Sequence, residues 1–272
     1  MNIRETPHAV ASTVEWEFAH STYAQVLADV PAALFPHWAQ TARIEFPGIP
    51  RDASFYAQSV EGLMMFFDCV AAASRPCALP SRAADSVWHA WTRMDAASLE
   101  RFCIRHFGKA IPHVEKANMA GSMGKALGAC LVQARRRGSW PVASIHLPRL
   151  FALDAQLGMP RGFGYCIIKG LVACSTLDEL GYSTSVSFPE CLTPIGLYRA
   201  GLISASEYNE AARLGLPGTQ GVVKEPEGGR FLDGLGIAVA LDGGTESGGG
   251  GSGDGDGGSS CGGCGGGGGC GS

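Results

Sequence analysis

Prolines and glycines interrupt the first half of the chain at short intervals, and this punctuation limits its fold more than any other feature. The breaks are Pro31, Pro36, the loop 47–50, the segment 75–80 and Gly108. Proline interrupts a helix because it lacks the amide proton and restricts the residue before it. Between the breaks, apolar residues recur at helical spacing, and strand patterns are nearly absent. We therefore predict an all-α bundle with short connections for this half.

Start and stop signals place the individual helices of the first half. Ser12 or Thr13 is a suitable N-cap for the first helix, and Asp52 marks the start of the third. Gly108 is a suitable stop for the last one. The expected helices cover a stretch after residue 13, a shorter segment ending near Pro47, and about 52–73, 82–93 and 95–107.

The second half of the chain is less regular. Ser204 followed by Glu207 is a capping-box pattern, which indicates a helix start. Residues 160–190 combine glycines with short apolar runs, so strand and helix both remain open there, and 231–241 is a candidate strand. The expected helices are 119–137, 149–157, 192–199 and 204–214. The predicted fold is mainly α, an irregular helical bundle.

The last thirty residues differ in composition from the rest of the chain. They hold 18 of the 39 glycines, and residues 248–272 contain no aromatic or aliphatic side chain. Such a segment cannot bury apolar area to offset its ordering entropy, so we predict a disordered Gly/Cys-rich tail. The expected domains are a helical domain at 1–118, a mostly helical region at 119–241 and the tail at 242–272.

The tail carries Cys261, Cys264 and Cys270. These thiols could bind a soft metal or form disulfides on oxidation. Free thiols in a flexible, low-complexity end are the favoured interpretation.

Charge and hydropathy exclude several classes of protein. The formal net charge is −4, and three of these units lie in residues 243–272. The body therefore lacks the basic field of a nucleic-acid-binding protein, and no nucleic-acid partner is expected. No apolar run approaches the ~18 residues of a membrane-spanning helix, and no signal peptide is visible. We therefore predict a cytoplasmic protein.

The cysteines of the body do not form a recognisable metal or disulfide pattern. They are Cys69, Cys77, Cys103, Cys130, Cys166, Cys174 and Cys191. No two of them make a Cys-x-x-Cys pair, which excludes a zinc ribbon and argues against a disulfide framework. In the cytosol such thiols stay reduced.

One short region combines residue types that bind metals. Asp85 and His89 are four positions apart, hence on one face of the predicted helix. Cys103 lies in the next predicted helix, and His113 follows the stop at Gly108. A carboxylate, a thiolate and two imidazoles are zinc ligands, so these four residues predict a zinc site. Two other interpretations stay open: the group only packs in the core, which we favour, or a His–Cys pair forms a nucleophile.

A longer motif surrounds these residues. It reads Asp-x-x-Trp-His at 85–89, Phe-Cys at 102–103, Phe-Gly at 107–108 and His at 113. This motif resembles the glycine-rich-domain-containing-protein-like family of bacteria and plants, although the segment between Trp88 and Cys103 departs from the family pattern. The resemblance implies a small helical domain and no settled biochemical activity. The residues on motif positions are Asp85, Trp88, His89, Cys103 and His113.

The remaining signals do not identify a reaction. Arg135–Arg137 forms a basic cluster at the end of a predicted helix, where a solvated last turn is favoured and an anionic partner is the alternative. Residues 121–126 lack the pattern of a phosphate-binding loop. We therefore expect a non-enzymatic interaction or scaffold protein with an unknown protein partner. The alternative is a metal-binding protein or metal-dependent hydrolase that uses Asp85, His89, Cys103 and His113.

Overall fold

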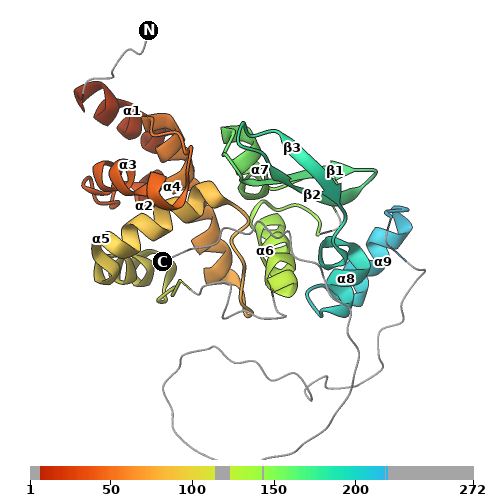
Figure 1. Cartoon of the computed structure of the whole chain (residues 1–272). Coiled ribbons are helices and arrows are strands. Elements are labelled where there is room, and N and C mark those ends of the chain that lie inside the picture. Colours follow the sequence, from red (N-terminus) through yellow and green to blue (C-terminus); the bar gives the residue numbers. More distant parts are fainter. Residues whose placement is uncertain (1–6, 114–122, 143, 218, 220–272) are drawn as a thin grey trace, which may run out of the picture.

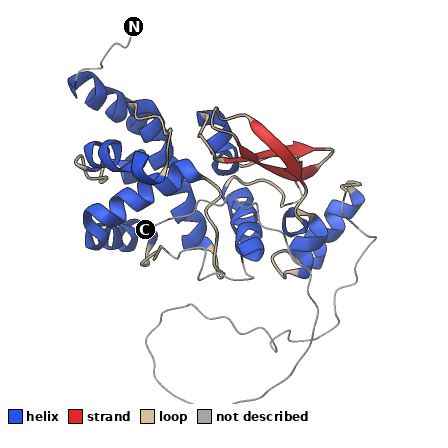
Figure 2. Ribbon diagram, in the orientation of Figure 1, coloured by secondary structure: helices blue, strands red, loops and turns tan. Residues whose placement is uncertain are grey.

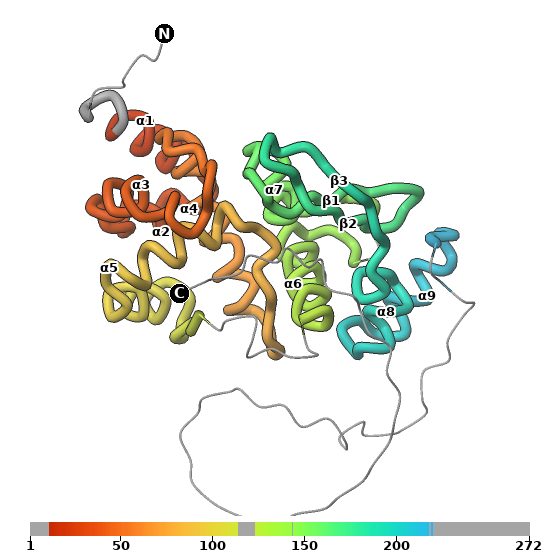
Figure 3. Tube along the Cα trace, in the orientation of Figure 1, coloured from red at the N-terminus to blue at the C-terminus, as the bar shows by residue number. Residues whose placement is uncertain are grey.

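The fold consists of a helical half and a mixed half joined by a common core. The computed structural model describes residues 7–113, 123–142, 144–217 and 219. Helices α1 to α5 form one side of the molecule, α6 lies in the middle, and the sheet and the α8–α9 hairpin lie on the other side (Figures 1 and 2). The chain passes through these parts in sequence order (Figure 3).

The described residues are mainly helical, as predicted, with one small sheet. The elements of the helical half are α1 (Pro7–His20), α2 (Ala24–Leu27), α3 (Leu34–Glu45), α4 (Ala53–Ala72) and α5 (Arg82–Phe107). Those of the mixed half are α6 (Met123–Arg137), α7 (Arg149–Leu157), β1 (Phe163–Ile168), β2 (Leu171–Leu177), β3 (Ser183–Ser187), the 3-10 helix η2 (Glu190–Leu192), α8 (Pro194–Arg199) and α9 (Ala205–Arg213).

Helix α4 is the central element of the helical half. It begins where the sequence predicts, because the Asp52 carboxylate accepts a hydrogen bond of 2.8 Å from the Phe55 amide. The helix packs against α1, α5, α6 and α7. These four helices surround α4 on most sides, which explains why α4 is apolar over most of its circumference.

The two helices predicted at 82–93 and 95–107 form one kinked helix, α5. At the kink, Asp95 leaves the helical conformation with φ −164° and ψ 89°. Its carboxylate accepts a hydrogen bond of 2.9 Å from the Ser98 amide and so caps the second part. The helix ends at Gly108, whose φ of 76° is the left-handed conformation expected of a glycine stop.

The predicted start of the first helix is wrong. Ser12 and Thr13 lie inside α1, which begins at Pro7. Proline is well suited to the first helical position, because the amide proton that it lacks would have no partner there. A capping residue type therefore does not mark a helix start by itself.

Residues 160–190, where the sequence left strand and helix open, contain an antiparallel sheet in the order β1-β2-β3. Lys169 and Gly170 join β1 to β2, and their positive φ angles of 50° and 80° give the two-residue turn that matches strand twist. The central strand β2 is mostly buried, whereas every residue of β3 is exposed. The described part of the second predicted region is therefore helical with a small sheet.

One hydrophobic core crosses both halves of the molecule. It includes Phe67 and Trp88 from the helical half and Leu131 and Phe151 from the mixed half. A smaller core lies between α6 and the α8–α9 hairpin and contains Val132, Val142, Leu197, Ile203 and Tyr208. The predicted boundary between residues 118 and 119 lies outside the described residues.

Asp154 of α7 joins three elements from a fully buried position. Its carboxylate accepts hydrogen bonds from the Ser81 hydroxyl (2.6 Å) and from the amides of Arg82 (2.9 Å), Ala83 (3.0 Å) and Phe163 (2.9 Å). Burial raises the pKa of Asp154, and these hydrogen bonds act in the opposite direction. The carboxylate thereby satisfies amides at the start of α5, where negative charge is favourable.

The C-terminal hairpin begins α9 with the predicted capping box. The Ser204 hydroxyl accepts a hydrogen bond of 3.1 Å from the Glu207 amide, and the Glu207 carboxylate accepts one of 2.7 Å from the Ser204 amide. The predicted strand at 231–241 and the predicted tail at 242–272 lie outside the described residues. Among the helices that are described, none is both long and apolar enough to cross a membrane.

Replacing Asp154 tests how much this carboxylate stabilises the fold. We expect Asp154→Asn to lower the free energy of unfolding by about 2–4 kcal/mol, because one acceptor oxygen becomes a donor facing buried donors. Urea denaturation measures the change. The matched control is Asp52→Asn at the exposed cap of α4, which should cost less than about 0.5 kcal/mol because asparagine caps as well as aspartate. Equal losses in the two variants would contradict the role of Asp154.

Candidate metal centre

The first turns of α5 place two potential metal ligands on one face. Asp85 and His89 are one helical turn apart, and the Asp85 Oδ2 atom lies 3.7 Å from the His89 Nε2 atom. Ser81 caps the helix by accepting a hydrogen bond from the Ala84 amide, and Asp154 binds the same turn. The start of α5 is therefore held firmly just before Asp85.

The third potential ligand, His113, comes from the segment after α5. The glycine stop at Gly108 turns the chain back along the helix, and Ile111 is buried in the core. The His113 Nε2 atom then lies 3.2 Å from the Asp85 Oδ1 atom. Its ring meets the Trp88 ring edge-on, with centroids 4.5 Å apart, and the His89 ring in the same way at 4.6 Å. Packing against Trp88 thus orients the imidazole toward Asp85.

Together, these residues form a compact group of three. Asp85, His89 and His113 each offer one ligand atom, and the three atoms lie within 4.8 Å of one another. The side chains are 32%, 30% and 21% exposed, respectively. The group is therefore open to solvent on one side.

Glu45, at the end of α3, supports this group from outside. Its Oε2 atom lies 2.5 Å from the His89 Nδ1 atom, and its other oxygen pairs with Arg93. A neutral imidazole that donates its Nδ1 proton to Glu45 carries its lone pair on Nε2, on the side of Asp85. Carboxylates commonly hold metal-binding histidines in this way.

The structure does not bring Cys103 into the group. Its thiol is completely buried, and burial raises its pKa to about 12, although a hydrogen bond with the Ile111 backbone acts in the opposite direction. A thiol in this setting stays protonated, which disfavours the nucleophile interpretation. The other predicted metal ligands, Cys261, Cys264 and Cys270, lie outside the described residues.

Glu45 is the residue of this site that the sequence did not indicate. It precedes His89 by 44 positions, and no local spacing connects the two. His106, which is close to the motif in sequence, instead lies 3.0 Å from the Asp29 carboxylate, away from the group. Closeness in the sequence therefore does not tell which residues belong to this site.

Comparison with known proteins gives a family without a stated activity. A model of the UCP032817-like family matches residues 17–180, more than half of the chain, and this span contains Glu45, Asp85, His89 and His113. No curated protein and no solved structure matches the chain. The resemblance to the glycine-rich-domain-containing-protein-like family stays a prediction.

Trp88 connects the site to the core, and its loss should be costly. Its ring is 5% exposed and packs against Phe66 and Phe67 as well as His113. We expect Trp88→Ala to reduce the free energy of unfolding by about 3–5 kcal/mol through lost transfer energy and the cavity it leaves. Trp16→Ala, at a ring that is 59% exposed, should change it by less than about 1 kcal/mol. Thermal or urea unfolding of both variants decides this, and a loss below about 1 kcal/mol at Trp88 would be contrary evidence.

Proposed function

The chain belongs to the UCP032817-like family, and we propose that it is a metal-binding protein that holds one divalent transition metal, zinc before others, between Asp85, His89 and His113. The observation that carries the proposal is the convergence of one carboxylate oxygen and two imidazole nitrogens within 4.8 Å, in an arrangement open to solvent. The sequence analysis gave a metal-binding protein as its alternative interpretation, with four ligands where the proposal has three.

The distances within the group suit a small ion. Tetrahedral ligands at about 2.0 Å from zinc lie about 3.3 Å from one another. The His113 Nε2 atom is already 3.2 Å from the Oδ1 atom of Asp85, and the His89 Nε2 atom is 3.7 Å from the other oxygen, Oδ2. Small side-chain rotations would therefore bring the three ligands around one ion.

The ligand set indicates a site with a free position. Structural zinc sites usually have four protein ligands rich in thiolate, whereas catalytic sites have three protein ligands and a solvent molecule. Two histidines and one carboxylate also bind other divalent metals, including iron. A bound ion would lower the pKa of its solvent ligand, which is the chemistry that a metal-dependent hydrolase uses. The group thus supports the hydrolase alternative better than a purely structural role.

Glu45 supports the same proposal. His89 has a carboxylate near each ring nitrogen, and a neutral imidazole can donate its single proton to only one of them, so a cation at Nε2 completes the arrangement. Such an outer carboxylate raises the basicity of a histidine ligand and fixes its ring.

Direct titration tests metal binding. After treatment with a chelator, the full chain should bind close to one equivalent of Zn²⁺ by isothermal titration calorimetry, and Co²⁺ should give the visible spectrum of a low-coordinate site. His89→Gln and His113→Gln should each weaken binding at least about 100-fold, because each removes a ligand. Glu45→Gln should weaken it about 10–100-fold.

Two further variants serve as matched controls for the titration. His106→Gln changes a histidine of the same helix that lies outside the group, and Cys103→Ala removes the fourth predicted ligand. Both should leave the affinity within about threefold of the unchanged chain. Binding below ~0.1 metal per chain would end the proposal, and a large loss in Cys103→Ala would restore the four-ligand site.

Partner binding is a second candidate function, because β3 forms an exposed edge of the sheet. Among the described residues no strand pairs with its outer side. The exposed apolar side chains on and around it are Leu180, Tyr182, Val186 and Phe188. Exposed edges and apolar side chains are features of sheets that pair with another chain. This observation favours the interaction or scaffold protein expected from the sequence.

Self-association is the simplest partner binding to measure at this edge. If β3 pairs with a second copy, sedimentation velocity should show reversible association that increases with concentration. Val186→Lys should abolish the association, because an edge lysine opposes strand pairing. The control is Ile44→Lys on α3, also at an exposed apolar residue, which should associate normally. A monomer at every concentration would refute pairing between copies.

A further inference from the structure

Three thiols from separate elements meet beside α6. Cys69 belongs to α4, Cys77 to the segment between α4 and α5, and Cys130 to α6. The thiols of Cys69 and Cys77 lie close enough to that of Cys130 to add to the effect of burial, which raises the pKa of Cys130. All three side chains belong to or pack against the main hydrophobic core. The fold thus gathers three cysteines that the sequence leaves unpaired.

Backbone contacts independently place these cysteines together. Helices α4 and α6 pack against each other, which brings Cys69 to the helix of Cys130. The amide of Ala78, the residue after Cys77, donates a hydrogen bond of 3.0 Å to the Ala126 carbonyl. Ala126 lies one turn before Cys130 on the same face of α6. The backbone beside Cys77 is therefore fastened next to the turn that carries Cys130.

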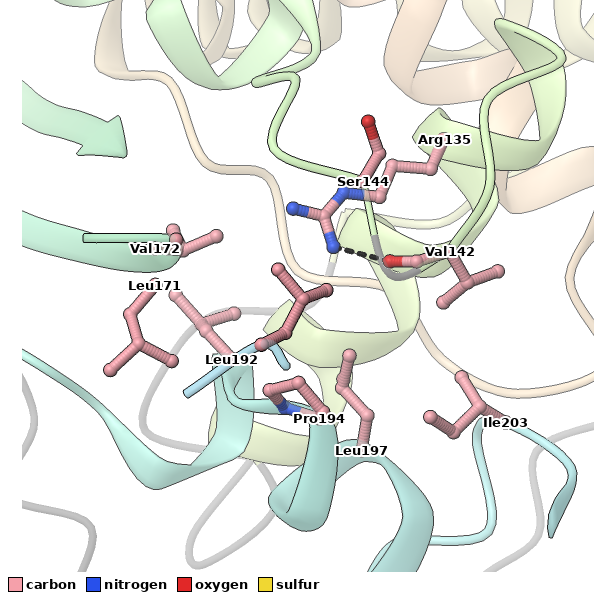
Figure 4. Close-up of a pocket in the computed structure, with 11 residues that line it drawn as sticks. Arg135, Val142, Ser144, Leu171, Val172, Leu192, Pro194, Leu197 and Ile203 are labelled. Atoms are coloured by element: carbon pink, nitrogen blue, oxygen red, sulfur yellow. Dashed lines mark hydrogen bonds between the residues drawn. The ribbon is translucent and has the colours of Figure 1, made fainter. Parts of the chain in front are cut away.

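The basic cluster at the end of α6 holds this helix in place. The Arg135 side chain turns inward, is only 4% exposed and donates from Nη1 to the Val142 carbonyl at 2.5 Å (Figure 4). Arg136 and Arg137 are exposed, as in a solvated last turn, and form ion pairs with α9 and α4. Cys130 is therefore carried by a firmly held helix.

The three thiols differ in their access to solvent. Cys69 is 2% exposed and Cys130 is fully buried, and both lie within helices. Cys77 is partly exposed, and residues 73–81 around it form neither helix nor strand. A reagent from solvent therefore reaches Cys77 first, and the irregular segment can move by the short distance that a bond to Cys130 requires.

A metal site does not explain this group. Among the residues that the structure describes, only Asp85, His89 and His113 form a set of three or more ligand atoms that all lie within 4.8 Å of one another. The three thiols are more widely spread, so they do not surround a single ion. Two neighbouring thiols, of which one is accessible, are instead the arrangement that thiol–disulfide exchange requires.

We propose that Cys77 and Cys130 are a site of reversible oxidation by low-molecular-weight disulfides such as oxidised glutathione, and that the product is a disulfide between Cys77 and Cys130. The Cys77 thiolate attacks one sulfur of oxidised glutathione, the glutathione S–S bond breaks and one glutathione thiolate leaves. The Cys130 thiolate then attacks the Cys77 sulfur and displaces the second glutathione. The protons of the two protein thiols pass to the two glutathione thiolates. One disulfide is thereby reduced and two protein thiols are oxidised.

The new bond would join two parts of the core that only packing holds together at this point. It would tie the segment that leads into α5 to α6 and so close a loop of about 50 residues. Neither cysteine is among the residues of the candidate metal centre, so this site is independent of the metal proposal.

Equilibration of the full chain with mixtures of reduced and oxidised glutathione tests the proposal. After alkylation of the remaining thiols, tandem mass spectrometry of the digest identifies the linked cysteines. The fraction with a Cys77–Cys130 link should rise with the share of oxidised glutathione, and dithiothreitol should return it to zero. This measurement uses the unchanged chain. A glutathione adduct on the exposed Cys166 verifies that the oxidant was active.

Two variants separate the roles of the neighbouring thiols. Cys77→Ser changes a partly exposed residue outside helices and strands, so it should fold, and it should lower the linked fraction of Cys130 at least about tenfold. The matched control Cys69→Ala removes the other neighbour and should form the Cys77–Cys130 link as the unchanged chain does.

Three results would overturn the proposal. The first is a lack of any Cys77–Cys130 link in the unchanged chain at every glutathione ratio. The second is a stable glutathione adduct on Cys77 in its place, because Cys130 would then not reach the Cys77 sulfur. The third is a link between Cys69 and Cys130 that forms equally in Cys77→Ser, because oxidation would then not begin at Cys77.

Discussion

The buried carboxylate of Asp154 is the interaction on which much of this structure depends. It binds the capping residue and two amides at the start of α5, and also the first amide of β1. A single side chain from α7 therefore fixes the helical half against the sheet. Because Asp85 follows within the next turn of α5, the same carboxylate also sets where the candidate metal ligands begin. The stability of the fold and the geometry of the site are thus coupled through one buried group.

The candidate metal centre lies where three separate constraints meet. Helix α5 supplies Asp85 and His89 four positions apart, a spacing that places them one turn apart on the same face of a helix. The turn at Gly108 returns His113 to that face, and the packing of α3 on α5 brings Glu45 to His89. Each contact is modest by itself, since the side chains are partly exposed. Their convergence would favour the binding of a metal ion, because several ligands are already held close together.

The tertiary structure also brings together residues that are far apart in the sequence, although no local pattern indicates that they meet. The thiols of Cys69 and Cys77 lie close enough to Cys130 to add to the effect of burial, which raises the pKa of Cys130, although the irregular cysteine spacing suggested no grouping. Arg135 is separated from Arg136 and Arg137 in the same way, since a helix turns successive side chains by about 100° and only one of the three faces the interior. The burial of polar side chains such as these is what a local sequence pattern predicts least well.

The sequence by itself determined most of the helices and several of their ends. Capping residues and glycine stops act over three or four residues, so the starts at Asp52 and Ser204 and the end at Gly108 were readable from local pattern. It also showed that Asp85 and His89 share a face. Only the tertiary structure decided that residues 163–187 pair as a sheet, that Glu45 joins the site while Cys103 does not, and that Arg135 is buried. The physical reason is that strand pairing, ligand convergence and burial depend on contacts between distant segments, whose register no local spacing encodes.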